Sequence, residues 1–358
     1  MCEKLTVRID RDIQVCYNFE IEEHAHTHGA RMNINKERNS DMKTNKLLSV
    51  VLTLCVLLAA FSLTALAAEG VTTAEALAAA LAAGGEVRLD ADITSVGAPV
   101  TVPAGVTATL DLNGHTLMVS KYTAAKDQVL VEGSLTLTDS VGTGKVCSDY
   151  TGTAGRVVSV LENGSLQLAG GTITTEGMTK SGIAVYVGGS GSFTLTGGTV
   201  YADAKRGNAA VNAVSATGKV EIVGGAVVAA EDAAGETNII AVKGSGNAVI
   251  SIGGTAAISG PQAVYAPSTV MTVTGGSFTG EVSAPKNSIS GGTFTTDVTD
   301  YLADEHVKIC EKQTDGTYQV LAASYAAAKI IAADGTATRY GSLAGAVAAL
   351  KDGDTLVM

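Results

Sequence analysis

Six pairs of adjacent glycines divide the latter half of the chain into similar phrases. Each phrase has alternating apolar residues, then Gly-Gly, then a small residue and one more apolar residue. A period in the twenties indicates that each phrase is one structural unit, which buries its apolar face against its neighbours. The first glycines are separated by steps of 27, 27, 29, 22 and 16 residues and stand at Gly170, Gly197, Gly224, Gly253, Gly275 and Gly291.

The apolar positions keep one register across the two 27-residue steps. Phe193 aligns with Leu166 before it and with Val220 after it. Alternation such as that of residues 192–196 predicts a strand with one face turned inward. Register of this kind favours stacked coils over the hairpins of a β-sandwich, because a one-residue slip would turn the core face outward. The repeats therefore predict an all-β parallel β-helix, with glycine pairs at its corners.

A second apolar run precedes each of these phrases. Val160, Val187 and Val214 each stand six residues before the aligned apolar position of the phrase that follows. We therefore expect two or three short strands per coil, and we expect these three valines to occupy equivalent positions in successive coils.

The first 68 residues differ from the rest. Residues 1–41 lack the repeat and carry a His-Ala-His-Thr-His run. We interpret them as a disordered segment, or as a mis-called segment upstream of the true start at Met42, rather than as a metal site. Residues 42–68 have the basic, apolar and small-x-small zones of a signal peptide, with cleavage signalled by Ala65, Ala67 and Ala68. The alternative is a retained signal anchor, since the uncharged run 47–68 is long enough to be a transmembrane helix.

Charge and cysteine content agree with an exported protein. Residues 1–46 hold equal numbers of acids and bases, so the remainder carries the whole formal charge of −11. An acidic body of this kind does not attract nucleic acid or an anionic membrane surface. After signal removal only Cys147 and Cys310 remain, which excludes a disulfide scaffold. We expect membrane contact only through 47–68, if that segment stays uncut.

Short helices are predicted near both ends of the mature chain. Thr72 and Glu75 have capping-box spacing before an alanine-rich run that Gly84-Gly85 ends. Such a helix would cover the open edge of the β-helix domain, which we assign to 69–300. Residues 301–320 read as a closing strand or hairpin. Residues 321–358 repeat the helix-and-strand beginning at an offset of 269, so we interpret them as the start of a second cap-and-strand unit and the chain as truncated.

The order of these motifs resembles a known group of proteins. GGEVRLDADI, VTVPAGVTATLDLNGHTL, the GGTI and GGTF coils and the YLAD…DGTYQV piece are similar to large surface or adhesin-like proteins of anaerobic gut bacteria with a pectate-lyase-like fold. The resemblance covers roughly 70–358. It implies a single-stranded, right-handed parallel β-helix with a short N-terminal capping helix and a C-terminal helix-containing segment. It says little about activity, because a fold does not determine a function.

Only one group of charged residues of both signs falls in register along the predicted coils. The loops after successive glycine phrases supply it, and the 27-residue step superposes Glu176 on Asp203. Solvated loop tips are the simpler interpretation, and a weak ligand contact is the alternative. The group consists of Glu176, Lys180, Asp203, Lys205, Arg206, Glu231 and Asp232.

No catalytic, metal or cofactor motif stands out elsewhere. His115 follows a turn and is expected at a corner. Threonines at 194–196 and 272–274 suggest an ice-binding array, but Glu221 and Ser251 interrupt it. We therefore expect a secreted or cell-surface structural or adhesive protein, non-catalytic and without a cofactor, whose partners are extracellular glycans or a host or cell-envelope surface. The alternative is a β-helix polysaccharide lyase or glycoside hydrolase that uses the charged loops.

Overall fold

The computed structural model describes residues 70–120, 126–152, 154–180, 182–203, 212–230, 239–303, 310–321 and 328–358. The signal segment, Lys205, Arg206, Glu231 and Asp232 lie outside these ranges. Among the described residues, no helix combines the length and apolar character needed to cross a membrane.

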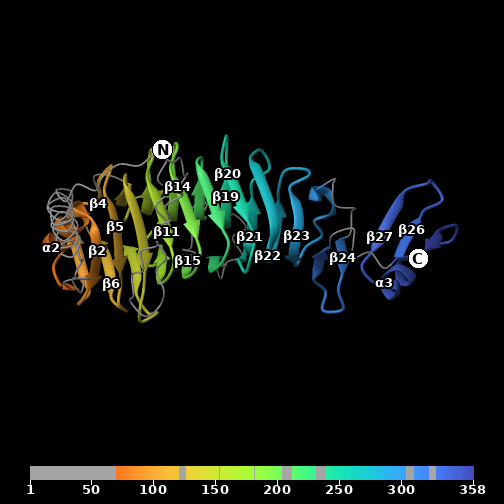
Figure 1. Cartoon of the computed structure of the whole chain (residues 1–358), viewed down its shortest axis with the longest axis horizontal. Helices are drawn as coiled ribbons and strands as arrows, with labels where there is room; N and C mark the ends of the chain where they lie inside the picture. Colours follow the sequence, from red (N-terminus) through yellow and green to blue (C-terminus); the bar gives the residue numbers. More distant parts are fainter. Residues whose placement is uncertain are drawn as a thin grey trace, which may run out of the picture. The chain divides into compact units, whose positions relative to one another are not determined.

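The described chain forms a parallel β-solenoid, which confirms the predicted fold class (Figure 1). Each coil adds a strand to each of three columns, and strands within a column pair in parallel. The first column contains β2 (Gly85–Leu89), β5 (Thr107–Asp111), β8 (Ser134–Thr138), β11 (Ser165–Leu168), β14 (Ser192–Leu195), β17 (Lys219–Ile222), β20 (Val249–Ile252) and the start of β22 (Val270–Ser283).

The other two columns are built in the same way. The second contains β3 (Ile93–Val96), β6 (Thr116–Ser120), β9 (Lys145–Ser148), β12 (Thr172–Thr174), β15 (Thr199–Ala202), β18 (Ala226–Ala229) and the start of β21 (Ala257–Tyr265). The third contains β4 (Val100–Val102), β7 (Asp127–Val131), β10 (Gly155–Val160), β13 (Gly182–Val187), β16 (Asn212–Ala216), β19 (Ile240–Gly244) and the ends of β21 and β22.

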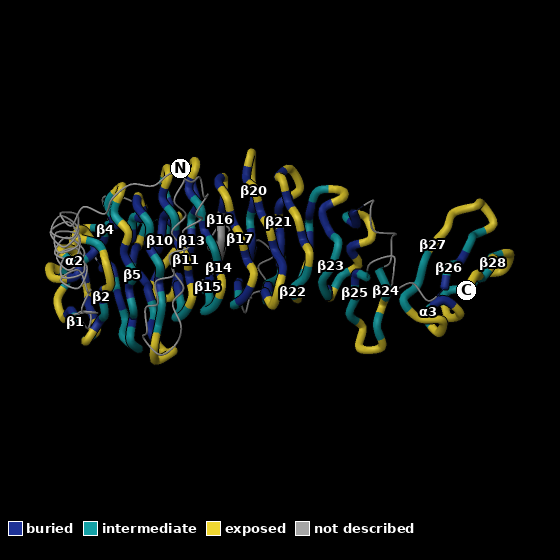
Figure 2. The backbone as a smooth tube through the Cα atoms, viewed as in Figure 1, coloured by how far each residue is buried: buried dark blue, intermediate teal, exposed yellow. Residues whose placement is uncertain are grey.

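The core is a stack of like residues inside the coils. Phe193 pairs with Leu166 and with Val220, as the repeat predicts, and all three side chains are buried. The strands alternate between buried and accessible positions along their length (Figure 2). Near the C-terminal end, the rings of Phe278 and Phe294 stack with centroids 4.6 Å apart. Apolar burial of this kind, repeated coil by coil, is the main stabilising contribution.

The second apolar run does not follow the predicted register throughout. Val160 pairs with Val187 as expected, but Val187 then pairs with Ala216, and Val214 pairs with Val185. The prediction that Val214 follows Val187 is therefore wrong by two residues. A shift of two keeps the same residues facing inward, so apolar alternation alone cannot detect it.

Different elements close the two ends of the solenoid. At the beginning, β1 (Gly70–Val71) pairs with β2, and α2 (Ala74–Ala83) packs on the first coil. The hydroxyl of Thr73 caps α2 by accepting from the Ala76 amide at 3.2 Å, so the N-cap falls one residue after Thr72. At the other end, β23 (Ile289–Phe294) is followed by the 3-10 turn Thr299–Tyr301. An antiparallel hairpin of β24 (Cys310–Lys312) and β25 (Tyr318–Val320) comes next. Its strand β25 pairs antiparallel with β23.

A separate small sheet follows. Its central strand is β26 (Ala328–Ile331), which pairs antiparallel with β27 (Ala337–Tyr340) on one side and with β28 (Thr355–Val357) on the other. The helix α3 (Leu343–Ala349) connects the two outer strands. Ala328, Ile330 and Ala346 form the buried core of this segment.

Candidate functional site

The charged loop group predicted from the sequence is only partly described. The Glu176 carboxylate accepts a hydrogen bond from the Lys145 ammonium at 3.2 Å, and Lys180 is exposed. The amide of Asp203 donates to the Thr175 hydroxyl at 2.8 Å. Thr174 pairs with Tyr201, so the 27-residue register holds up to this loop. Lys145, on the preceding coil, is a partner that the sequence interpretation missed.

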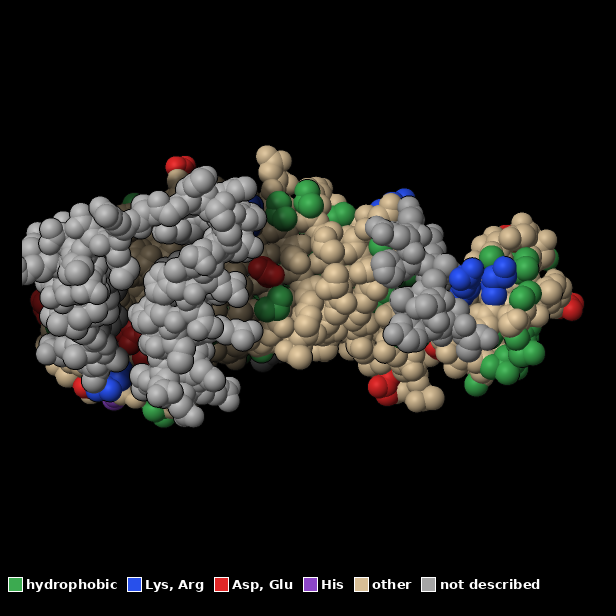
Figure 3. All heavy atoms as spheres, viewed as in Figure 1, with side chains coloured by type: hydrophobic (Ala, Val, Ile, Leu, Met, Phe, Trp, Pro, Cys, Tyr) green, Lys and Arg blue, Asp and Glu red, His purple; other side chains and the backbone are tan. Residues whose placement is uncertain are grey.

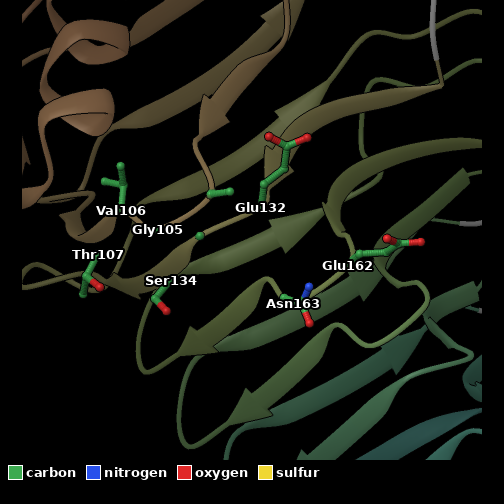
Figure 4. Close-up of a pocket in the computed structure, with 9 residues that line it drawn as sticks. Gly105, Val106, Thr107, Glu132, Ser134, Glu162 and Asn163 are labelled. Atoms are coloured by element: carbon green, nitrogen blue, oxygen red, sulfur yellow. The ribbon is translucent and has the colours of Figure 1, made fainter.

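A hollow at one corner of the solenoid brings polar groups from three successive coils together. It has a volume of about 250 Å³. The turn that follows each third-column strand forms this corner (Figure 4). The lining residues are Ala104, Gly105, Val106, Thr107, Glu132, Gly133, Ser134, Glu162 and Asn163.

Unequal turn lengths create the hollow. The turns at 103–106 and 161–164 have four residues each, whereas the turn between them consists of Glu132 and Gly133 alone. The amides of these two residues donate to the Val102 carbonyl at 3.0 and 3.1 Å. A Cβ on Gly133 would lie 2.3 Å from the carbonyl oxygens of Pro103 and Val106, so only glycine allows so close an approach. The short turn therefore sits between two longer ones.

Glu132 stands in the middle of this arrangement, between the turn of Gly105 and the turn of Glu162 and Asn163 (Figure 4). Its side chain is exposed. The Glu162 side chain leans towards the next coil, since its Cγ lies 3.0 Å from the position that a Cβ would take on Gly189. Glu132 is thus the central carboxylate of the hollow, and Glu162 lies at its rim.

Asn163 is held in place by the following coil. Its backbone amide donates to the Ser190 hydroxyl at 3.0 Å, and that hydroxyl donates to the Asn163 side-chain oxygen at 3.1 Å. Asn163 has a positive φ of 63°, which asparagine tolerates better than most residues. The two contacts engage the amide oxygen of Asn163 with the protein and leave its amide nitrogen as the end that can donate to a ligand.

The sequence interpretation missed this hollow because its residues do not repeat in kind. The signal was in the spacing. Val131 stands four residues before Leu135, whereas Val160 stands six residues before Leu166. A short turn between longer turns is visible in that comparison.

A second polar group joins neighbouring coils of the third column. Arg156 donates to the Asp127 carboxylate at 3.1 Å, and the Ser159 hydroxyl donates to the same oxygen. The guanidinium carbon of Arg156 lies 3.4 Å from the centre of the Tyr186 ring. These groups use one another as partners, so we assign them to coil stacking rather than to ligand binding.

The structure also locates His115 and the threonine rows discussed in the sequence analysis. His115 lies at a corner, with Nδ1 3.4 Å from the Asp92 carboxylate. Thr194 pairs with Glu221, Glu221 with Ser251 and Ser251 with Thr272, so the threonine rows are interrupted as the sequence indicates. Within the described ranges, His, Cys, Asp and Glu side chains form no group of three or more that could hold a metal ion.

Comparison with known proteins finds no matching family model, no matching curated protein and no matching solved structure.

Proposed function

We propose that the chain is a secreted or cell-surface adhesive protein, non-catalytic, that contacts extracellular glycans through the corner hollow. The observation that carries this proposal is that Glu132, Asn163 and Ser134 all line one hollow about 250 Å³ in volume. Carboxylates accept hydrogen bonds from sugar hydroxyls, whereas amides and hydroxyls can also donate to sugar oxygens. The signal-peptide pattern and the resemblance to surface β-helix proteins support export to the cell surface.

Size and openness favour one unit of a longer glycan. Typical pockets for small ligands measure roughly 300–1,000 Å³ and enclose most of the ligand. This hollow is smaller, and its lining residues Thr107, Glu132 and Asn163 are exposed. It would therefore hold a single sugar residue while the rest of the glycan stays in solvent.

Charge further limits the class of glycan. The hollow contains two carboxylates and no basic residue among those that line it, and the chain as a whole carries −11. Repulsion between like charges disfavours uronic acid and sulfated polymers. We therefore propose neutral or amino-sugar glycans as the ligands.

The test is binding of the purified protein to a panel of neutral, amino-sugar and acidic glycans. We expect neutral or amino-sugar glycans to bind and Glu132→Gln to weaken binding about tenfold or more, because a hydrogen bond to a charged group contributes about 1.5–3 kcal/mol. Glu221→Gln removes the same charge from an exposed position on β17 outside the hollow and should leave binding unchanged. Equal effects of the two variants, or binding confined to acidic glycans, would contradict the proposal.

A further inference from the structure

The C-terminal segment repeats the cap that begins the solenoid. At an offset of 269 residues, Ser342 corresponds to Thr73, and Met358 corresponds to Leu89. Both helices are capped in the same way. The Thr73 hydroxyl accepts from Ala76, and the Ser342 hydroxyl accepts from Gly345, at 3.2 and 3.1 Å.

A glycine with positive φ stands between helix and strand in both units, although the C-cap of α2 is Gly84 and the C-cap of α3 comes earlier, at Leu350. Gly84 ends α2 with a φ of 80°, and its counterpart Gly353 has a φ of 88°. Each glycine stands shortly before the strand, β2 in one unit and β28 in the other. The same order of strand, helix, left-handed glycine and strand therefore occurs twice in the chain.

The two units differ on both sides of the strand that follows the helix. In the first unit, β2 pairs with β1 on one side and with β5 on the other. In the second unit, β26 lies between β27 and β28 and pairs with both. The side of β28 that faces away from β27 has no strand partner among the described residues. This is the side on which β2 receives β5.

The apolar side chains of the C-terminal strand are also less buried than their counterparts on β2. Val87 and Leu89 on β2 are 3% and 0% exposed, because the first coil covers them. Their counterpart Leu356 is only partly buried, and Met358 is 87% exposed. Other large apolar side chains are exposed in the same unit, namely Leu343, Val347 and Val357. Figure 3 shows apolar side chains gathered on this segment.

We propose that the free edge of β28 is a docking site for a further parallel β-solenoid coil, paired as β5 is paired to β2. Such a coil would satisfy the open amides and carbonyls of β28 and cover Leu356 and Met358. The first unit shows what covers this edge when a coil is present. The proposal is independent of the glycan hollow.

The test appends residues 90–320 of the same chain directly after Met358, so that the added coil follows β28 in the register in which β3 follows β2. The appended part ends with its own closing hairpin. We expect hydrogen exchange of those amides of residues 355–358 that point away from β26 to slow by about 100-fold relative to the unextended chain. The same extension joined through a flexible Gly/Ser linker, or carrying Leu356→Asp, should lose this protection.

Protection that is absent, or that persists with the linker and with Leu356→Asp, would overturn the proposal. So would concentration-dependent dimerisation of the unextended chain that Leu356→Asp abolishes, because the occupant would then be a second copy.

A second variant tests the proposal in case the extended chain does not fold. Residues 342–358 replace 73–89 in the full chain, with Ala346→Leu to restore the volume of buried Leu77. We expect this chimera to keep a cooperative solenoid transition. A chimera that melts like a chain lacking 73–89 would contradict the proposal.

Discussion

Two constraints act together at Gly198, the second glycine of its pair. Its φ is +72°, and a Cβ built on it would lie 2.5 Å from the Gly171 carbonyl oxygen of the preceding coil. The second glycines of the other pairs also have positive φ, at Gly171, Gly225, Gly254, Gly276 and Gly292. The glycine pairs therefore permit both the corner conformation and the close stacking of coils.

We predict that Gly198→Ala lowers the free energy of unfolding by about 3 kcal/mol or more, because it combines backbone strain with a clash against backbone. Gly246→Ala is the matched control. Its φ is +59°, but nothing lies within 4 Å of the added Cβ, so strain alone should cost about 1 kcal/mol. Urea unfolding of both variants measures the difference. Equal losses would show that coil contact at Gly198 is unimportant.

Asp111 joins two coils at another corner. Its carboxylate accepts from the amides of Asn113 and Ser140, both at 2.9 Å. Burial alone would raise the pKa of this carboxyl, but the two amide donors, with the Ser140 hydroxyl and the charge of Arg88, together hold the pKa below its ordinary value. The sequence alone does not show this contact, because Ser140 lies on the next coil.

We predict that Asp111→Asn destabilises the protein at pH 7 by about 1–3 kcal/mol. Because the folded state lowers this pKa, the stabilisation is complete above the ordinary carboxyl pKa and is lost as the pH falls through the lower, folded value. The gap between wild type and variant should therefore narrow in acid. Unfolding measured across pH tests this, with exposed Asp352→Asn as the control. A gap that stays constant down to pH 2 would contradict it.

At the scale of elements, strand β14 shows how coil stacking fixes which residues face inward. Phe193 and Leu195 are 1% and 0% exposed, while Thr194 between them faces outward. Leu195 pairs with Leu168 on one side and with Ile222 on the other. A charge at this position would have no polar partner in a column of apolar side chains.

Leu195→Asp should therefore destabilise the solenoid by about 4 kcal/mol or more and broaden its unfolding transition, since neighbouring coils lose their contacts. Gln167→Asp places the same side chain at an exposed position of β11 and should cost less than about 1 kcal/mol. Thermal unfolding followed by circular dichroism compares the two. Unchanged melting of the Leu195 variant would mean that the inward face is assigned wrongly.

At the scale of the whole molecule, the signal-peptide pattern of residues 42–68 predicts where the mature chain begins. The predicted cleavage after Ala67 or Ala68 would release a chain that begins near Glu69, just before β1. We predict this start for protein recovered from the medium or cell envelope. N-terminal sequencing and intact mass measure it. Recovery of a chain that begins at Met1 or Met42 in the membrane fraction would instead make 47–68 an anchor.

The sequence by itself determined the features that depend on local pattern. Alternation at 192–196 predicted both strand and inward face, and Gly-Gly pairs marked the corners, because these preferences arise within a few residues. The match between 342–358 and 73–89 was also legible without a structure. The handedness of the coils stays a prediction drawn from the resemblance.

Only the tertiary structure decided which residues of successive coils meet where the repeat is irregular. The shift that pairs Val214 with Val185 leaves the inward face unchanged, so the apolar pattern gives no sign of it. Glu132 and Asn163 border one hollow because turns of unequal length stack on each other. The strand β26 separates β27 from β28 through pairing that no local preference specifies. Each of these features depends on contacts between distant residues, which the repeat constrains only in part.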